Sequence, residues 1–184
     1  MKVTMVSVCS ADGKMTRGDD PLVQHWSSKD DFAHFMELIN AHKLLVMGRK
    51  TFEAVEPHPQ PERLRVVLTS TPDDFAAAVI PGQLEFSSAA PRDLVASLED
   101  RGYDSLLLLG GGHVNAAFLQ AGLVNELYMT IEPVLFGMGT RMVDGAVPNV
   151  QLQLLDTRPL NNTGTLLLHY VVKPPVLDRG ASAQ

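Results

Sequence analysis

The stretch Leu107-Leu108-Leu109-Gly110-Gly111-Gly112-His113 passes from an apolar run through three glycines into a helical pattern. The leucines predict a short strand that is buried on both faces, as in a parallel sheet. Residues 113–120 predict a helix, whose first free N–H groups would attract phosphate. The stretch therefore predicts a strand, a phosphate-binding turn and a helix. A plain turn is the alternative, because Asn115 occupies the place of the last glycine in the G-x-G-x-x-G pattern.

Two further segments share this layout, Leu45-Val46-Met47-Gly48-Arg49-Lys50-Thr51 and Val66-Val67-Leu68-Thr69-Ser70. In a parallel sheet the C-terminal ends of the strands share one edge, where ligands bind. Arg49 and Lys50 add positive charge at that edge, and the hydroxyl groups are donors for phosphate oxygens. Each segment alone could be a simple turn or a solvated helix start. Together the three predict a dinucleotide site with extra positive charge for a 2′-phosphate, which favours NADP over NAD.

The rest of the chain alternates strand and helix patterns over its first two thirds. Strands are expected at residues 3–9, 43–47, 64–69, 84–87, 105–109 and 125–136. Helices are expected from the N-cap Ser28 to about His42 and at 51–55, 91–101 and 113–120. Two closing strands, 151–156 and 165–172, flank a turn. This order predicts an α/β three-layer sandwich with a mostly parallel central sheet plus antiparallel C-terminal strands. We expect a single domain over residues 1–173 and a loose tail over 174–184.

Composition narrows the classes of function. The chain has 184 residues, 45% of them hydrophobic, and a formal net charge of −6. The sequence has no cluster of Lys and Arg typical of a nucleic-acid binder, and no apolar run as long as a membrane span. The single cysteine, Cys9, and the lack of a signal-peptide pattern favour a reducing, cytoplasmic setting. The six histidines lack the spacing of metal ligands, so we predict no metal site.

The motifs resemble those of the dihydrofolate reductase-like superfamily. The resemblance rests on Met47-Gly48-Arg49-Lys50-Thr51-Phe52-Glu53, on Thr69-Ser70 and on Gly110-Gly111-Gly112-His113-Val114. Four more segments resemble its riboflavin-biosynthesis reductase branch, which includes the C-terminal domain of the bacterial bifunctional deaminase-reductase. They are Ser10-Ala11-Asp12-Gly13-Lys14-Met15-Thr16, Trp26-Ser27-Ser28, Gly122-Leu123-Val124-Asn125-Glu126-Leu127 and Pro133-Val134-Leu135-Phe136-Gly137-Met138-Gly139. The resemblance runs from about residue 2 to about residue 172.

The resemblance implies a role for each motif. The phosphates of NADPH would be held by Gly48, Arg49, Lys50, Thr51, Thr69, Ser70, Gly110, Gly111, Gly112, His113 and Val114. The nicotinamide would lie near Val8, Ser10 and Met15, under the loop that runs from Asp12 to Thr16. The substrate would contact Trp26, Asp31, Phe35 and Thr130. Asp31, in the position of the substrate carboxylate of folate-reducing members, and Asp12 would be the catalytic acids.

The sequence departs from the branch at two places. The glutamate that usually precedes the glycine run is replaced by Leu109, and residues 29–43 contain no arginine that could hold a substrate phosphate. The zinc deaminase motif of the bifunctional enzymes is also absent. Plain structural alternatives stay open as well. Asp31 could be a first-turn helix carboxylate, Asp12 could shape an Asp-Gly turn, and Trp26 could be a core residue.

These observations predict an NADPH-dependent reductase of a pyrimidine- or pteridine-like heterocycle. The best named case is a 5-amino-6-(5-phosphoribosylamino)uracil reductase of riboflavin biosynthesis. A dihydrofolate reductase or another reductase of the superfamily is the first alternative, and a non-catalytic nucleotide-binding module is the second. Phe32, Phe35, Met36 and Ile39 are expected to form the buried face of the first helix. The family also implies a homodimer, formed through residues 125–136 and 165–172.

Overall fold

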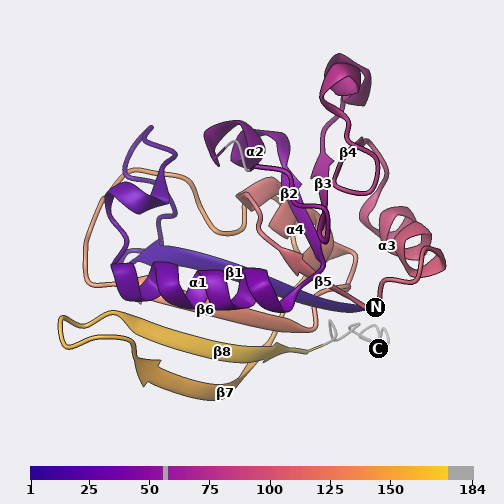
Figure 1. The fold of residues 1–184 in the computed structure, drawn as a ribbon. Helices are drawn as coiled ribbons and strands as arrows, with labels where there is room; N and C mark the ends of the chain where they lie inside the picture. Colours follow the sequence, from indigo (N-terminus) through magenta and orange to yellow (C-terminus); the bar gives the residue numbers. More distant parts are fainter. Residues whose placement is uncertain (56–57, 174–184) are drawn as a thin grey trace, which may run out of the picture.

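A computed structural model of the chain describes residues 1–55 and 58–173. Its centre is an eight-stranded sheet with the order β4-β3-β2-β5-β1-β6-β8-β7 (Figure 1). The strands are β1 (Lys2–Ser10), β2 (Leu44–Gly48), β3 (Leu64–Leu68), β4 (Leu84–Ser87), β5 (Ser105–Leu108), β6 (Glu126–Glu132), β7 (Leu152–Pro159) and β8 (Leu166–Val172). The helices are α1 (Lys29–Ala41), α2 (Arg49–Val55), α3 (Pro91–Asp100) and α4 (Gly112–Gln120), with the 3-10 helices η1 (Val23–His25) and η2 (Pro72–Ala78).

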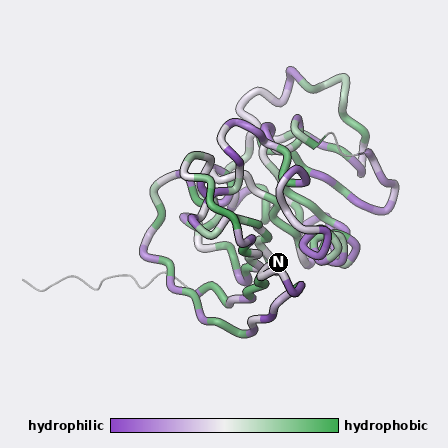
Figure 2. Tube along the Cα trace, turned by 90° about the vertical axis from the view of Figure 1, so that its left-hand side faces the viewer, coloured by the Kyte–Doolittle hydropathy of each residue, from purple (hydrophilic) through white to green (hydrophobic). Residues whose placement is uncertain are grey.

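The first six strands pair in parallel, whereas β8 pairs antiparallel with β6 on one side and with β7 on the other. This arrangement confirms the predicted α/β class with a mostly parallel sheet and antiparallel C-terminal strands. The parallel strands are nearly continuous hydrophobic runs because helices cover both of their faces. Figure 2 shows this pattern, with hydrophobic segments gathered along the strands and hydrophilic ones mostly on the outer loops.

Two groups of buried side chains form the core, one on each face of the sheet. On one face, side chains of α3 and α4, among them Leu98 and Phe118, pack against Val3, Val46 and Leu108. On the other face, side chains of α1 and α2 pack against Met47, Val67 and Leu107. The alternating direction of side chains along each strand supplies both groups.

The helix α1 shows why a local pattern can mislead. Its N-cap is Ser28, as predicted, and the Ser28 hydroxyl accepts a hydrogen bond from the Asp31 amide at 3.2 Å. The expected apolar face was partly wrong, because Phe32 is 46% exposed whereas Asp31 and His34 are buried. The helix is rotated so that Asp31 and His34 face the sheet, where they contact Thr130 and Tyr128 of β6.

The structure also corrects several boundaries. The long strand expected over 125–136 ends at Glu132, since Pro133 cannot donate to a ladder. The helix expected from Thr51 begins at Arg49, directly after β2. The two 3-10 helices were not predicted. The tail expected over 174–184 lies outside the described residues. In the ranges that the structure describes, no helix is long and apolar enough to span a membrane.

Candidate functional site

The C-terminal ends of β2 and β5 meet in a glycine-lined edge. The Gly48 amide donates to the Gly110 carbonyl at 2.7 Å, which joins the two strand ends. A Cβ atom on Gly48 would lie 3.0 Å from Val114 Cγ2, and one on Gly111 would lie 3.5 Å from the Thr51 hydroxyl. The peptide between Gly110 and Gly111 is cis. The structure thus brings together five of the residues that the sequence assigns to the cofactor.

The N-terminus of α4 opens onto this edge. Its N-cap is Gly111, and no side chain caps the first N–H groups of the helix. A nine-residue helix of this kind favours an anion at its N-terminus. The side chain of His113 is 83% exposed, and its ring lies 3.3 Å from the Asp144 carboxylate. The glycines and Val114 therefore form the inner surface, and His113 lies at the outer rim.

Positive charge and hydroxyl groups flank the same edge. Arg49 is exposed and its guanidinium forms two hydrogen bonds with the Glu53 carboxylate, at 2.8 and 2.9 Å. The neighbouring side chain of Lys50 is also exposed. Leu68 pairs with Gly48 in the sheet, so Thr69 and Ser70 continue from β3 just beyond the glycine edge. These groups fit the polyanionic end of a dinucleotide, which is the ligand predicted from the sequence.

Two loops beside β1 are held together by Asp12. Its carboxylate accepts hydrogen bonds from the Ser10 hydroxyl at 2.6 Å and from the amides of Phe136 and Gly137 at 3.1 and 2.7 Å. These bonds, the Ser10 bond above all, lower the pKa of Asp12 to about 2. An ionised acceptor of this kind organises a loop and holds no proton to donate near neutral pH. This geometry favours the turn-shaping alternative for Asp12.

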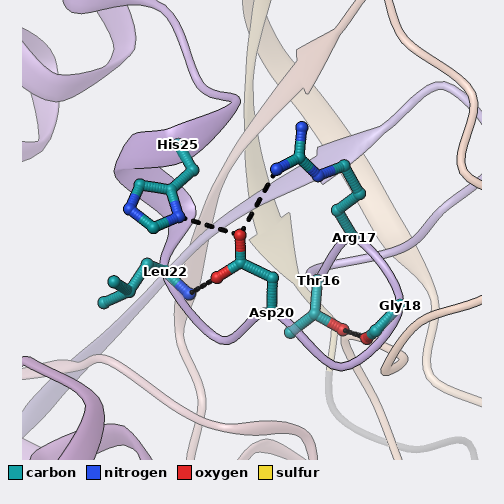
Figure 3. A network of polar contacts seen from close by, with 6 residues as sticks. All are labelled: Thr16, Arg17, Gly18, Asp20, Leu22 and His25. Atoms are coloured by element: carbon teal, nitrogen blue, oxygen red, sulfur yellow. Dashed lines mark hydrogen bonds and ion pairs between the residues drawn. The ribbon is translucent and has the colours of Figure 1, made fainter.

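The loop that follows β1 has a second polar network further along the chain, between Thr16 and His25 (Figure 3). The Asp20 carboxylate accepts from the Leu22 amide at 3.0 Å and lies 2.8 Å from His25 Nδ1 and 3.5 Å from Arg17. The Thr16 hydroxyl donates to the Gly18 carbonyl in the same turn. The loop is therefore a folded unit over β1. Within it, Met15 lies over β1, its sulfur accepting from the Ser7 hydroxyl at 3.3 Å.

Asp31 lies on the first turn of α1, against β6. It is 6% exposed, and it hydrogen-bonds with the side chains of Thr130 and Ser27. Burial is the main cause that raises the pKa of Asp31, and the charge of Glu132 adds to it, whereas the two hydrogen bonds and His34 oppose it. Asp31 is therefore a carboxyl group that its surroundings bias towards the protonated state.

The other predicted substrate contacts lie around this acid. Thr130 is buried beside Asp31 and pairs with Val8 across β6 and β1. Trp26 packs edge-on against Phe136 at 5.0 Å, and its indole N–H is buried without a partner among the described residues. Phe35 is half-buried and packs against the core on the α1 face. In residues 1–55 and 58–173, no cluster of three or more His, Cys, Asp or Glu side chains could hold a metal ion.

Two buried polar residues near the start of α1 are not among the site residues predicted from the sequence, where Glu132 is interpreted only as a possible strand cap. Glu132 is 4% exposed and Thr165 is 0% exposed, and they hydrogen-bond to each other at 2.7 Å. The one signal in the sequence was a glutamate inside an otherwise apolar strand pattern, which is typical of a paired buried charge. Its partners come from distant parts of the chain and cannot be found from local periodicity.

Comparison with known proteins identifies the family of this chain. The model of the RibD C-terminal domain matches residues 1–166. A solved structure of a putative riboflavin biosynthesis protein from Shewanella sp. PV-4 is similar, with a TM-score of 0.76 and 21% identity, over 94% of this chain and 99% of that one. A pyrimidine reductase-like protein from Corynebacterium diphtheriae has a TM-score of 0.74 and 13% identity, over 94% of this chain and 92% of its own.

Relatives found by sequence lie in the same superfamily. The uncharacterized protein YwjB of Bacillus subtilis is 21% identical over 178 residues, which cover 92% of this chain and 97% of YwjB. The dihydrofolate reductase of the same organism is 30% identical over 110 residues, which cover 57% of this chain and 55% of that enzyme. The riboflavin-branch and folate-branch likenesses that the motifs suggested are thus both present.

Proposed function

Because this chain belongs to the RibD C-terminal domain family, we propose that it is an NADPH-dependent reductase of a pyrimidine- or pteridine-like heterocycle. The observation that carries the proposal is the placement of two sites on one sheet edge. The glycine edge at the ends of β2 and β5 fits a dinucleotide phosphate, and the Asp31–Thr130 pair follows on β6, with only β1 between. Ligands of parallel sheets bind at this edge.

Different residues of the chain would donate the proton, orient the donor and exclude water in such a reaction. Bound NADPH would supply the hydride to an electron-poor carbon of a C=N or C=O bond. Asp31, or a water molecule that it holds, supplies the proton that the reduced heteroatom needs, and Thr130 and Ser27 fix its orientation. The loop pinned by Asp12 covers β1 and excludes water from the reacting groups. No nucleophile from the protein is needed.

Two substrate classes compete within this proposal. The family favours 5-amino-6-(5-phosphoribosylamino)uracil, since its structural neighbours include the bifunctional deaminase and 5-amino-6-(5-phosphoribosylamino)uracil reductase of Thermotoga maritima. That neighbour has a TM-score of 0.71 and 17% identity, and this chain spans 56% of its length. Dihydrofolate is the second candidate. It is favoured by the first helix, which has no arginine for a phosphate and exposes Phe32 near Asp31.

A turnover assay tests the proposal and separates the classes. Loss of NADPH absorbance is followed with 5-amino-6-(5-phosphoribosylamino)uracil and with dihydrofolate, at matched concentrations. Asp31→Asn is the matched control, because asparagine keeps the shape of the side chain and cannot donate the proton. We expect one substrate to be reduced by the wild-type protein and the rate to fall by about 10²- to 10⁴-fold in the variant. Binding of NADPH without reduction of any heterocycle would instead favour a non-catalytic nucleotide-binding module.

We also propose that the protein is a homodimer and that β7 forms the contact. The strands first considered for this role, β6 and β8, have neighbours on both edges. The edge strand beside them is β7, where Leu152, Leu154 and Leu155 are 43%, 48% and 51% exposed. An unpaired apolar edge of this length favours pairing with another chain. Sedimentation analysis should show a dimer for the wild-type protein and a monomer for Leu154→Glu, and a wild-type monomer would refute the proposal.

A further inference from the structure

Glu132 is a buried carboxylate at the C-terminal end of β6. Its Oε1 atom accepts a hydrogen bond from the Ser28 amide at 2.7 Å, and its Oε2 atom accepts one from the Thr165 hydroxyl at 2.7 Å. Both oxygens are thus engaged, as expected for a buried ionic group that the fold retains. The two donors come from the start of α1 and the start of the last strand, so Glu132 connects three segments.

The contacts around Glu132 fix the residue that caps Asp31. Ser28 donates its amide to Glu132, and its own hydroxyl accepts from the Asp31 amide at 3.2 Å. The turn of the hairpin formed by β7 and β8 reinforces this arrangement. There the Asn161 side-chain amide donates to the Thr165 hydroxyl at 2.9 Å and to the Asp30 carboxylate at 3.2 Å. The first turn of α1 is therefore held at Asp30 by the hairpin and at Ser28 by Glu132. Asp31 follows directly after the anchor at Asp30.

Charge acts in the same direction as geometry. Asp31 and Glu132 are both buried, and the charge of Glu132 adds to burial, the main cause that raises the pKa of Asp31. On α1, His34 faces Asp31 and has the opposite effect, while Asp30 is turned towards Asn161. The sheet contributes Thr130 and the preceding loop contributes Ser27, both uncharged. Glu132 is thus the charged group of the sheet that acts on Asp31.

We propose that Glu132 is a positioning residue for the reductase reaction: it anchors the first turn of α1 through Ser28 and holds its charge beside Asp31. This inference rests on the proposed function, because it assigns Asp31 as the proton donor. It also gives a reason for the hairpin to reach α1. The Thr165 hydroxyl compensates the buried charge of Glu132, which would be costly without a partner.

The test is an NMR titration of the Asp31 carboxyl carbon, with the resonance assigned from Asp31→Asn. Glu132→Gln removes the charge and keeps the oxygen that accepts from the Ser28 amide, while its NH2 group replaces the oxygen that accepts from Thr165 and would donate to that hydroxyl instead. We expect the Asp31 titration midpoint to move to lower pH in this variant. Thr165→Val is the matched control, because it breaks a hydrogen bond at the same site and leaves the charge in place. An unchanged midpoint in Glu132→Gln, or an equal fall in both variants, overturns the proposal.

A second variant keeps the test decisive if Glu132→Gln does not fold. Glu132→Met also removes the charge and keeps the length of the side chain, so its Asp31 titration is measured in the same way, and an unchanged midpoint overturns the proposal.

The pH profile of turnover separates this inference from the proposed function. For Glu132→Gln, the fall of kcat at high pH should begin at a lower pH, and each unit of that displacement lowers the rate on this limb about tenfold. If Glu132→Gln turns over substrate with an unchanged pH profile, the proposed role of Glu132 is wrong and the proposed reductase activity still holds. A shifted NMR midpoint in a protein that reduces neither substrate shows that the carboxyl coupling is real and that the proposed reaction is wrong.

Discussion

Replacing Arg49 by alanine should weaken the binding of NADPH and leave the binding of NADH almost unchanged. Arg49 is the first residue of α2, directly after the glycine end of β2, and its side chain is 44% exposed. In the described structure its guanidinium is paired with Glu53, four residues further along the same helix. A 2′-phosphate would have to compete with this pair, and NADH has no such phosphate.

The two interactions differ enough in strength for the phosphate to win. An exposed ion pair of this spacing contributes about 0.3–0.5 kcal/mol. A hydrogen bond between charged groups contributes about 1.5–3 kcal/mol. The net loss in Arg49→Ala is therefore about 1–2.7 kcal/mol for NADPH, which is about a five- to hundredfold increase in Kd. The loss of the Glu53 pair alone should hardly change the stability of the protein.

Calorimetric titration with both cofactors checks this reasoning. Glu53→Gln is the matched control, because it releases Arg49 and should improve the NADPH affinity about twofold. Both variants should bind NADH like the wild-type protein. If Arg49→Ala weakened both cofactors equally, Arg49 would act through the local structure. If it weakened neither, the 2′-phosphate would bind elsewhere.

Three further predictions follow from the geometry. The pKa of Asp31 is raised in the folded protein, so its contribution to stability is complete below the unfolded value of 3.8 and is lost as the pH rises through the folded pKa. Asp31→Asn should therefore raise Tm at pH 8 and not at pH 3. A lower Tm of the variant at pH 8 contradicts this prediction. Gly139→Ala should lower Tm more than Gly13→Ala, because both glycines have positive φ and only the Gly139 Cβ would overlap the Thr16 carbonyl; equal losses would show that the loop gives way. The lowered pKa of Asp12 places its stabilising effect above 3.8, with loss only as the pH falls towards about 2. Hydrogen exchange at the Gly137 amide should therefore stay slow at pH 4 in the wild-type protein and become fast in Asp12→Ala, and fast exchange in both would refute the loop contact.

The sequence alone determined the fold class and the glycine-lined sheet edge. Apolar runs such as Leu107–Leu109 are long enough for a strand that is buried on both faces, and a glycine or hydroxyl residue follows each of three such runs. Both signals are local, because they depend on residues that are neighbours in the chain. Parallel strands place their C-terminal ends on one edge, so the grouping of Gly48 with Gly110 followed from the strand pattern.

The surroundings of Asp31 were decided only by the tertiary structure. The hydrophobic pattern of α1 placed Phe32 on the buried side, whereas in the structure Asp31 is buried, beside Thr130 and Ser27, and Phe32 is exposed. Glu132 meets Ser28 across 104 positions of sequence and Thr165 across 33. Whether a carboxyl group is buried, and next to which charge, depends on such distant contacts. The pattern of the chain therefore identifies Asp31 as a candidate acid. Only the packing of α1 against β6 and against the hairpin of β7 and β8 determines how its surroundings raise its pKa.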